Sequence, residues 1–226
     1  MAPLLGENLV AIYLGGSFAT GDFVPGVSDY DLMVVTEHDL DAQAVTRLRS
    51  YHHDLARSDA DSLRLEGDYV PRQWITAEGT TSPTWWFRGG QLHDPAPMLS
   101  ADNIANLRTD GIAVFGPPPD ALLPPVTPDQ VRAAVREMLA EEPDVNDERS
   151  AAKEVLDVAR SLAALETGRP TSHAAGVRWA MANVDARWLD AVRHAAEVRA
   201  GAAVDANDDR LRRALTAWRR SLGLTS

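Results

Sequence analysis

The chain of 226 residues contains no cysteine. This absence excludes a disulfide framework and any metal site built on thiolates, and it fits a protein of the reducing cytoplasm. No apolar run approaches the roughly 18 residues of a membrane-spanning helix. The N-terminus also lacks the basic flank and long apolar core of an export signal. We therefore expect a cytoplasmic protein that does not enter a membrane.

Basic side chains are scarce. The chain has 22 Lys and Arg residues against 33 Asp and Glu residues, a formal net charge of −11. Proteins that bind nucleic acids gain affinity from a basic surface that releases counterions, so this balance argues against a nucleic-acid partner. It favours a small molecule, cationic or neutral, as the ligand.

Charge and proline divide the chain into two parts. Residues 1–125 carry 7 basic and 17 acidic side chains, whereas residues 126–226 carry 15 and 16. Six of the 14 prolines fall between residues 116 and 128. Proline neither continues a helix interior nor donates a hydrogen bond in a sheet. We therefore expect two domains, residues 1–124 and residues 125–226.

The two parts differ in the period of their apolar residues. The first alternates short apolar runs with amphipathic stretches, which predicts an α+β domain with a mixed sheet. The second has an apolar stripe of helical period throughout, with short connections, which predicts an all-α helical bundle. The first part contains predicted strands at 10–14, 29–35, 63–70 and 112–115 and predicted helices at 39–55 and 103–109. The second contains predicted helices at 128–141, 147–166, 172–181, 185–199 and 208–222. The expected N-terminal caps are Asp39 or Asp41 for the helix at 39–55, and Thr127, Ser172, Asp185 and Asp208 for the first, third, fourth and fifth helices of the second part.

A glycine turn and an acidic pair stand out in the first domain. Gly16 and Ser17 follow the first apolar strand, where backbone N–H groups and a hydroxyl can converge on phosphate oxygens. Asp29 and Asp31 open the next strand, and side chains two apart on a strand share a face. Their backbones lie about 6–7 Å apart, so both carboxylates reach one hard cation such as Mg²⁺. The alternative is a solvated acidic strand end.

A second pair of acids, Glu66 and Asp68, shares one face of the strand predicted at 63–70. A strand, helix, strand connection makes this strand a neighbour of the one at 29–35, so that the carboxylates converge. We take Glu66 as the general base, because a base must not be consumed by the cation. Asp68 is the alternative base, and the solvated face of an edge strand is the alternative structure.

The motif Gly16-Ser17, eleven further residues, then Asp29-Tyr30-Asp31 resembles that of the polymerase-beta-like nucleotidyltransferases. Nearly the whole chain, from Leu9 onward, resembles the streptomycin/spectinomycin type of aminoglycoside adenylyltransferases. The segments that carry this second resemblance are Leu65-Glu66-Gly67-Asp68-Tyr69-Val70-Pro71, Val114-Phe115-Gly116-Pro117, Val155 to Arg160, Glu166 to Arg169, Ser172-His173 and Gly176 to Met181.

The resemblance implies roles for particular residues. Ser17 and Ser28 would hold the triphosphate of ATP, and Asp29 and Asp31 would bind one or two Mg²⁺ ions. Glu66 would deprotonate the acceptor hydroxyl. From the helical domain, Arg160 would contact the nucleotide, and His173 stands where the family has a phosphate-binding lysine. The acids of the family that contact the drug fall in the region of Asp144, Asp147 and Glu148, with the spacing displaced by a few residues.

The sequence thus predicts a magnesium-dependent enzyme that transfers AMP from ATP to a hydroxyl of a small molecule. An aminoglycoside or aminocyclitol antibiotic is the expected acceptor. Two alternatives belong to other classes. One is a nucleotidyltransferase that modifies a protein, as in toxin–antitoxin systems. The other is a non-catalytic regulatory protein that binds nucleotides with the same fold.

Overall fold

The computed structural model describes residues 1–96, 99–204 and 208–224, and the chain forms two compact units. The main boundary lies between Thr127 and Pro128, three residues beyond the one expected from the prolines. Residues 24–27 group with the second unit, which the sequence did not indicate. None of the described helices has the length and apolar character that a membrane crossing requires. The first unit comprises Met1–Phe23 and Ser28–Thr127, and the second comprises Val24–Val27 and Pro128–Ser226.

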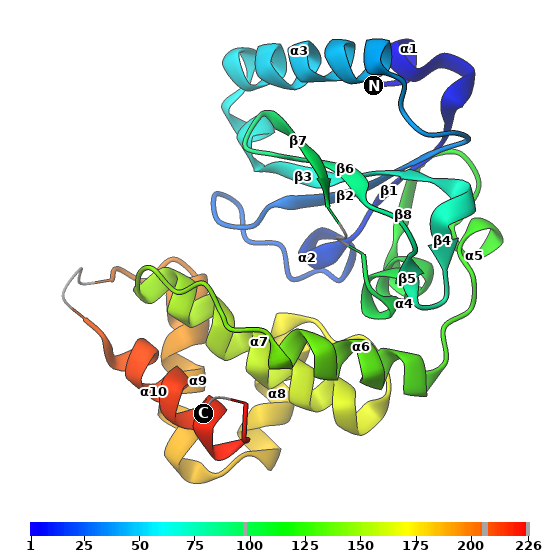
Figure 1. Cartoon of the computed structure of the whole chain (residues 1–226). Helices are drawn as coiled ribbons and strands as arrows, with labels where there is room; N and C mark the ends of the chain where they lie inside the picture. The colour runs from blue at the N-terminus through cyan, green and yellow to red at the C-terminus, as the bar shows by residue number, and fades with distance from the viewer. Residues whose placement is uncertain (97–98, 205–207, 225–226) are drawn as a thin grey trace. The chain divides into compact units, whose positions relative to one another are not determined.

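A mixed six-stranded sheet forms the first unit, in the order β7-β6-β3-β2-β1-β8 (Figure 1). Only β2 and β3 pair in parallel, and the other neighbours are antiparallel. The strands are β1 (Leu9–Leu14), β2 (Tyr30–Thr36), β3 (Leu65–Pro71), β6 (Thr84–Arg88), β7 (Gln91–Ala96) and β8 (Ile112–Phe115), and a small separate sheet pairs β4 (Ile75–Thr76) with β5 (Gly79–Thr80). The predicted mixed sheet and the neighbouring positions of the two acidic strands are confirmed.

Helices cover both faces of this sheet. One face packs against α1 (Ala2–Leu5) and α3 (Ala42–Ser58), with Val34, Leu48, Tyr69 and Phe87 among the buried residues. The other face packs against α4 (Ala101–Asp110) and the short α5 (Pro119–Leu122), with Met33, Val35, Val70 and Ile104 in its core. Alternate residues of β2 and β3 therefore serve opposite cores, as the period of two along a strand requires.

A register shift in β1 between Leu9 and Ala11 changes the face that its side chains reach. Leu9 packs in the core between the sheet and α3, whereas Ala11 and Tyr13 pack in the core between the sheet and α4. One extra residue in a strand reverses the side-chain alternation beyond it. The bulge thus lets β1 contribute to both cores.

The hairpin of β6 and β7 was not predicted. Its two-residue loop is Gly89-Gly90, and both glycines have positive φ angles of 59° and 76°. Such a loop matches the twist of antiparallel strands and requires glycine or a similarly permissive residue. Phe87 of β6 is buried in the core between the sheet and α3, and Trp85 packs against that core.

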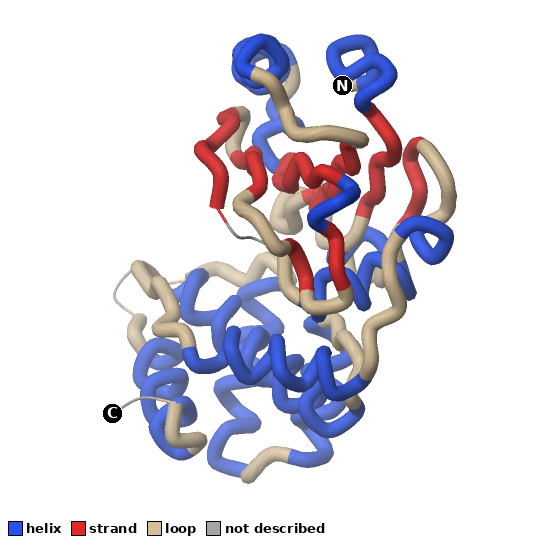
Figure 2. Tube along the Cα trace, turned by 45° about the vertical axis from the view of Figure 1, so that its right-hand side comes forward, coloured by secondary structure: helices blue, strands red, loops and turns tan. Residues whose placement is uncertain are grey.

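Five longer helices form the second unit (Figure 2). The central one is α7, which contacts each of the other four and buries eleven of its residues. Small side chains, among them Ala151, Ala159 and Ala163, let the neighbouring helices approach closely. The helices are α6 (Pro128–Ala140), α7 (Glu148–Thr167), α8 (His173–Asn183), α9 (Ala186–Arg199) and α10 (Arg210–Ser221).

Three predicted helix caps are confirmed. The carboxylates of Asp41 and Asp185 and the hydroxyl of Ser172 accept hydrogen bonds from backbone N–H groups at the starts of their helices. Asp147, which was not predicted as a cap, does the same for α7. For α10 the capping position is Asp209, one residue after the predicted Asp208. Asp209 makes no side-chain cap hydrogen bond, whereas Asp208 Oδ1 accepts Arg210 N–H at 3.0 Å.

Buried His52 on α3 makes the first unit sensitive to acid. Its Nε2 lies 2.8 Å from the Tyr69 hydroxyl, and its ring stacks on Phe87. Burial lowers its pKa from 6.5 to about 4. Between these values the unfolded chain binds more protons than the folded one, so the free energy of unfolding falls as pH drops through this window, by about 2–3 kcal/mol.

We expect His52→Gln to flatten the dependence of stability on pH between 6.5 and 4, measured by denaturant unfolding at a series of pH values. The variant is less stable than the wild type at neutral pH, because it loses ring packing. His53→Gln, on the exposed side of α3, is the control and should keep the wild-type slope. Parallel slopes for all three proteins would contradict the role of His52.

Candidate active site

The glycine turn after β1 is fitted to one carboxylate. Gly15 N–H donates to Asp31 C=O at 2.8 Å, which joins the turn to the start of β2. Gly16 has a φ angle of +55°, and a Cβ atom at this position would overlap the Asp31 carboxylate. Glycine is required here for both reasons. The turn continues into α2 (Gly16–Ala19), in which Ser17 is the second residue.

The parallel register of β2 and β3 places Asp31 beside Glu66. The two side chains interact directly, and the pKa of Glu66 rises from 4.5 to about 7. Burial is the main cause, Arg88 acts in the opposite direction, and the charges of Asp31 and Asp29 raise the pKa further. The next residue, Gly67, lies so close to the Leu32 carbonyl oxygen that no side chain fits there. The strands thus approach closely at the point where the carboxylates meet.

Arg88 of β6 completes this cluster and was not predicted. It stands directly opposite Glu66 in the antiparallel pair β3–β6. Its Nε lies 3.1 Å from Glu66 Oε2, and its Nη2 lies 3.9 Å from Asp29 Oδ2. The sequence signal was the Gly89-Gly90 hairpin, which fixes β6 as the next strand and Arg88 as its last residue.

Asp68 takes a different position from Glu66, although both belong to the same face of β3. It is buried, and the Thr84 hydroxyl donates a hydrogen bond to its Oδ1 at 3.0 Å. Burial raises its pKa from 3.8 to about 6, and the hydrogen bond acts in the opposite direction. Asp29, Asp31 and Glu66 therefore converge. The fourth acid, Asp68, is buried and does not belong to this group.

Ser28 immediately precedes Asp29 and is buried, while Ser17 is half-buried at the glycine turn. The first unit thus brings the predicted residues Gly16, Asp31 and Glu66 together. The three carboxylates form a set of hard oxygen donors, with the charges of Asp31 and Asp29 raising the pKa of Glu66, and a divalent cation would relieve their repulsion. The residues present fit Mg²⁺.

A second charged cluster lies in the helical unit, around the buried carboxylate of Asp157. Arg160 Nε donates to its Oδ1 at 2.6 Å, and His173 Nε2 lies 3.0 Å from the same oxygen. Lys153, the one lysine of the chain, binds Oδ2 at 2.7 Å. Although burial acts to raise the pKa of Asp157, the charges of Arg160 and Lys153 and the bond from His173 hold it well below 3.8. Asp157 and Lys153 were not predicted.

Helix packing fixes the position of this cluster. A Cβ atom at Gly176 would lie 2.6 Å from the Arg160 Cα, so α7 and α8 cross in backbone contact there. Burial lowers the pKa of His173, with Asp157 acting in the opposite direction, so the ring is neutral at pH 7. A carboxylate only accepts hydrogen bonds, hence the ring proton sits on Nε2, and Nδ1 is an acceptor. In this form His173 does not offer a second donor to a phosphate.

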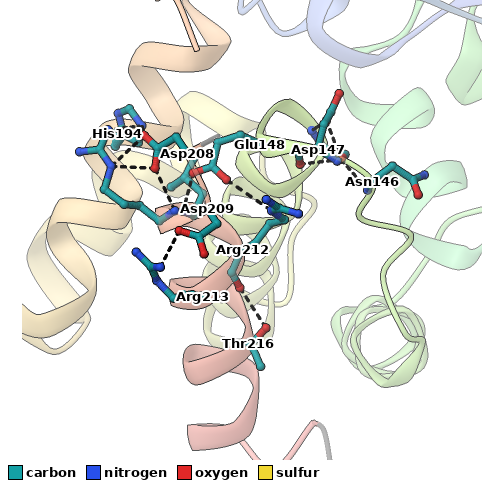
Figure 3. Close-up of polar contacts among 12 residues, drawn as sticks. Asn146, Asp147, Glu148, His194, Asp208, Asp209, Arg212, Arg213 and Thr216 are labelled. Carbon is teal, nitrogen blue, oxygen red and sulfur yellow. Dashed lines mark hydrogen bonds and ion pairs between the residues drawn. The ribbon is translucent and has the colours of Figure 1, made fainter. Parts of the chain in front are cut away.

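The region of Asp144, Asp147 and Glu148 is occupied by helix ends (Figure 3). Asp147 caps α7, and buried Glu148 accepts Leu211 N–H at 2.6 Å. Glu148, His194 and Asp208 have ligating atoms within 4.8 Å of one another. However, Arg210 Nε binds both Asp208 oxygens, at 2.8 and 3.0 Å. The group therefore joins the start of α7, the middle of α9 and the residues before α10, and the charge of Asp208 is balanced by Arg210.

Two family models match different parts of this chain. The Nucleotidyltransferase domain model matches residues 5–76. The Aminoglycoside adenylyltransferase, C-terminal domain model matches residues 121–222. Spectinomycin 9-adenylyltransferases from two Staphylococcus aureus strains are each 29% identical over 194 residues, which cover 79% of this chain and 73% of theirs.

A solved structure has the same fold. The crystal structure of spectinomycin adenyltransferase AAD(9) from Enterococcus faecialis with ATP and spectinomycin matches with a TM-score of 0.76 and 16% identity. The match covers 98% of this chain and 94% of that chain. The fold and the two matched domains thus define an enzyme of the nucleotidyltransferase class. Within that class, the second unit matches the C-terminal domain of aminoglycoside adenylyltransferases, in agreement with the sequence resemblance.

We expect Gly16→Ala to abolish AMP transfer, because the new methyl group displaces the Asp31 carboxylate. The positive φ angle alone costs about 1–2 kcal/mol for a residue with a side chain. Gly21→Ala is the matched control, with a φ angle of +78° and no atom within 4 Å of the added Cβ. Thermal unfolding should show a similar loss for both variants, and only Gly16→Ala should be inactive. Equal activities of the two variants would show that Gly16 is not part of the active site.

Proposed function

We propose that the protein transfers AMP from ATP to a hydroxyl group of an aminoglycoside or aminocyclitol antibiotic in a magnesium-dependent reaction. The observation that carries this proposal is the convergence of Asp29, Asp31 and Glu66 beside the Gly16 turn. The family match supplies the reaction class. The antibiotic acceptor is supported by the relatives, whose printed names are those of spectinomycin adenylyltransferases.

Each group has one task in this reaction. The backbone at Gly16, with the hydroxyls of Ser17 and Ser28, binds the triphosphate. Asp29 and Asp31 hold one or two Mg²⁺ ions, which when bound neutralise negative charge on the transferred phosphoryl group and on the leaving pyrophosphate. Glu66 takes the proton of the acceptor hydroxyl. The acceptor oxygen forms the new bond to the α-phosphorus, and the bond from that phosphorus to the bridging oxygen breaks, so that pyrophosphate leaves with the electron pair.

The helical unit supplies nucleotide contacts in this proposal, through Arg160 held by Asp157. His173 remains a proposed nucleotide-binding position, with its ring proton already engaged by Asp157. The net charge of −11 supports a cationic acceptor over a nucleic acid. A reaction that consumes ATP, in a chain without cysteine, fits the cytoplasm, where we place the enzyme.

The test is a reaction of the purified protein with ATP, Mg²⁺ and a panel of antibiotics that includes spectinomycin and streptomycin, read by mass spectrometry. The proposal expects a product heavier by one AMP and release of pyrophosphate, both lost in Asp29→Asn. Label transferred from ATP to lysate proteins instead would favour the protein-modifying alternative. ATP binding without pyrophosphate release from any acceptor would favour the regulatory one.

The assignment of the base predicts a difference between Glu66 and Asp68. Glu66→Gln keeps the size of the side chain but cannot accept the proton, so the rate should fall by roughly 10²–10⁴. Asp68→Asn should be mild, because an amide oxygen still accepts the Thr84 hydroxyl at a position enclosed by the sheet.

Initial rates and calorimetric affinity for Mg²⁺ with a non-hydrolysable ATP analogue check both variants. Nucleotide affinity should stay near that of the wild type in Glu66→Gln. A severe loss in Asp68→Asn together with a mild effect of Glu66→Gln would assign the base to Asp68.

A further inference from the structure

Arg88 is the one group of the cluster whose charge is opposite to that of the acids. It is held opposite Glu66 by the strand pair β3–β6, and its guanidinium lies between Glu66 and Asp29. Its side chain is 64% exposed, compared with 31% for Glu66. The position of its backbone is therefore fixed by the sheet, while its charged end stays accessible to solvent.

Glu66 could take either of two roles, metal ligand or base, and Arg88 favours the second. Asp31 and Glu66 are neighbours in the sheet, so a cation bound to the aspartates lies within reach of Glu66 as well. Carboxylate oxygens are good Mg²⁺ ligands, and a glutamate that ligates the metal is a poor base. Arg88 Nε–H occupies Glu66 Oε2, and the adjacent positive charge opposes the approach of that carboxylate to a dication.

We propose that Arg88 is a positioning residue that keeps Glu66 out of the Mg²⁺ coordination shell and so leaves its carboxylate to act as the base. This inference rests on the proposed function, because it concerns the same metal and the same base. It separates two roles that the sequence left open for Glu66, base or third ligand. Cation binding, in addition to activity, therefore reports on Arg88.

Removal of Arg88 has two consequences. Loss of a unit charge about 5 Å from a dication strengthens cation binding by roughly tenfold when solvent screens the interaction. Glu66, released from its partner, turns to the metal and adds a ligand. Both consequences raise affinity for the cation, and the second also lowers kcat, because the base is consumed.

The experiment is a double-mutant cycle with Mn²⁺ as the probe, measured by titration calorimetry and by the electron paramagnetic resonance of free Mn²⁺. The four proteins are the wild type, Glu66→Gln, Arg88→Ala and the double variant. In the wild-type background, Glu66→Gln should weaken Mn²⁺ affinity by no more than roughly tenfold, the effect of one nearby charge that is not a ligand. In the Arg88→Ala background it should weaken affinity by roughly 10-fold or more beyond that effect, since a ligand is lost there.

Additive effects on Mn²⁺ affinity would overturn the proposal, because they would show that Arg88 acts only through its charge. A loss of affinity well beyond tenfold on Glu66→Gln in the wild-type background would also overturn it, because Glu66 would already be a ligand. The rates should agree with the cycle, with kcat of Arg88→Ala reduced by about 10-fold or more and a KM for ATP close to the wild-type value.

Two further variants complete the design. Arg72→Ala removes a similarly exposed arginine that pairs with Glu37 at the other end of β3, and it should leave Mn²⁺ affinity and kcat unchanged. Asp29→Asn tests the metal site itself. If this variant binds Mn²⁺ as tightly as the wild type, the proposed function fails at its metal site. If it loses Mn²⁺ while the cycle is additive, only the role of Arg88 fails.

Discussion

The parallel pairing of β2 with β3 is the constraint on which the first unit depends. At one end of the pair, Asp31 and Glu66 are held side by side, and their mutual repulsion opposes folding. At the other end, Val34, Val35 and Val70 are fully buried. Burial of each such side chain contributes about 1.5–3 kcal/mol. The apolar half of each strand thus stabilises an acidic half that would not assemble alone, and it holds the acids close together despite their repulsion.

The helical unit has the opposite arrangement of charges. Here a single buried carboxylate, that of Asp157, is surrounded by basic side chains. Removing one partner would leave charge unbalanced inside the protein, which is costly. The backbone contact of Gly176 with Arg160 prevents α8 from sliding along α7. Helix packing and Asp157 together therefore set the directions of the Arg160 and His173 side chains. Asp157, which orients the arginine, also accepts the hydrogen bond from the imidazole of His173.

Local signals in the sequence predicted most of the fold. Gly16-Ser17, Asp-x-Asp and the helix caps act within a few residues, so their geometry can be predicted without knowing the rest of the chain. The partner of Glu66 could not be predicted in this way. Arg88 reaches Glu66 only because the Gly89-Gly90 hairpin adds β6 to the edge of β3, and no spacing in the sequence records that pairing. Asp157 was missed for a similar reason, since an acid on an amphipathic helix is normally solvated, and only the crossing with α8 shows that this one is buried.

The position of β8 beside β1 has a consequence for how the molecule is made. These neighbouring strands lie far apart in the sequence, and the hydrogen bond from Tyr13 to the Pro117 carbonyl joins residues 104 positions apart. During synthesis on the ribosome, the outer edge of β1 stays unpaired until almost the whole first unit has emerged. In the second unit, α6, α7, α8 and α9 each contact the next helix along the chain, and such local contacts form faster. An unpaired β1 edge is a template for association with other chains, so the interval before residue 117 emerges is when the nascent chain is most exposed to aggregation.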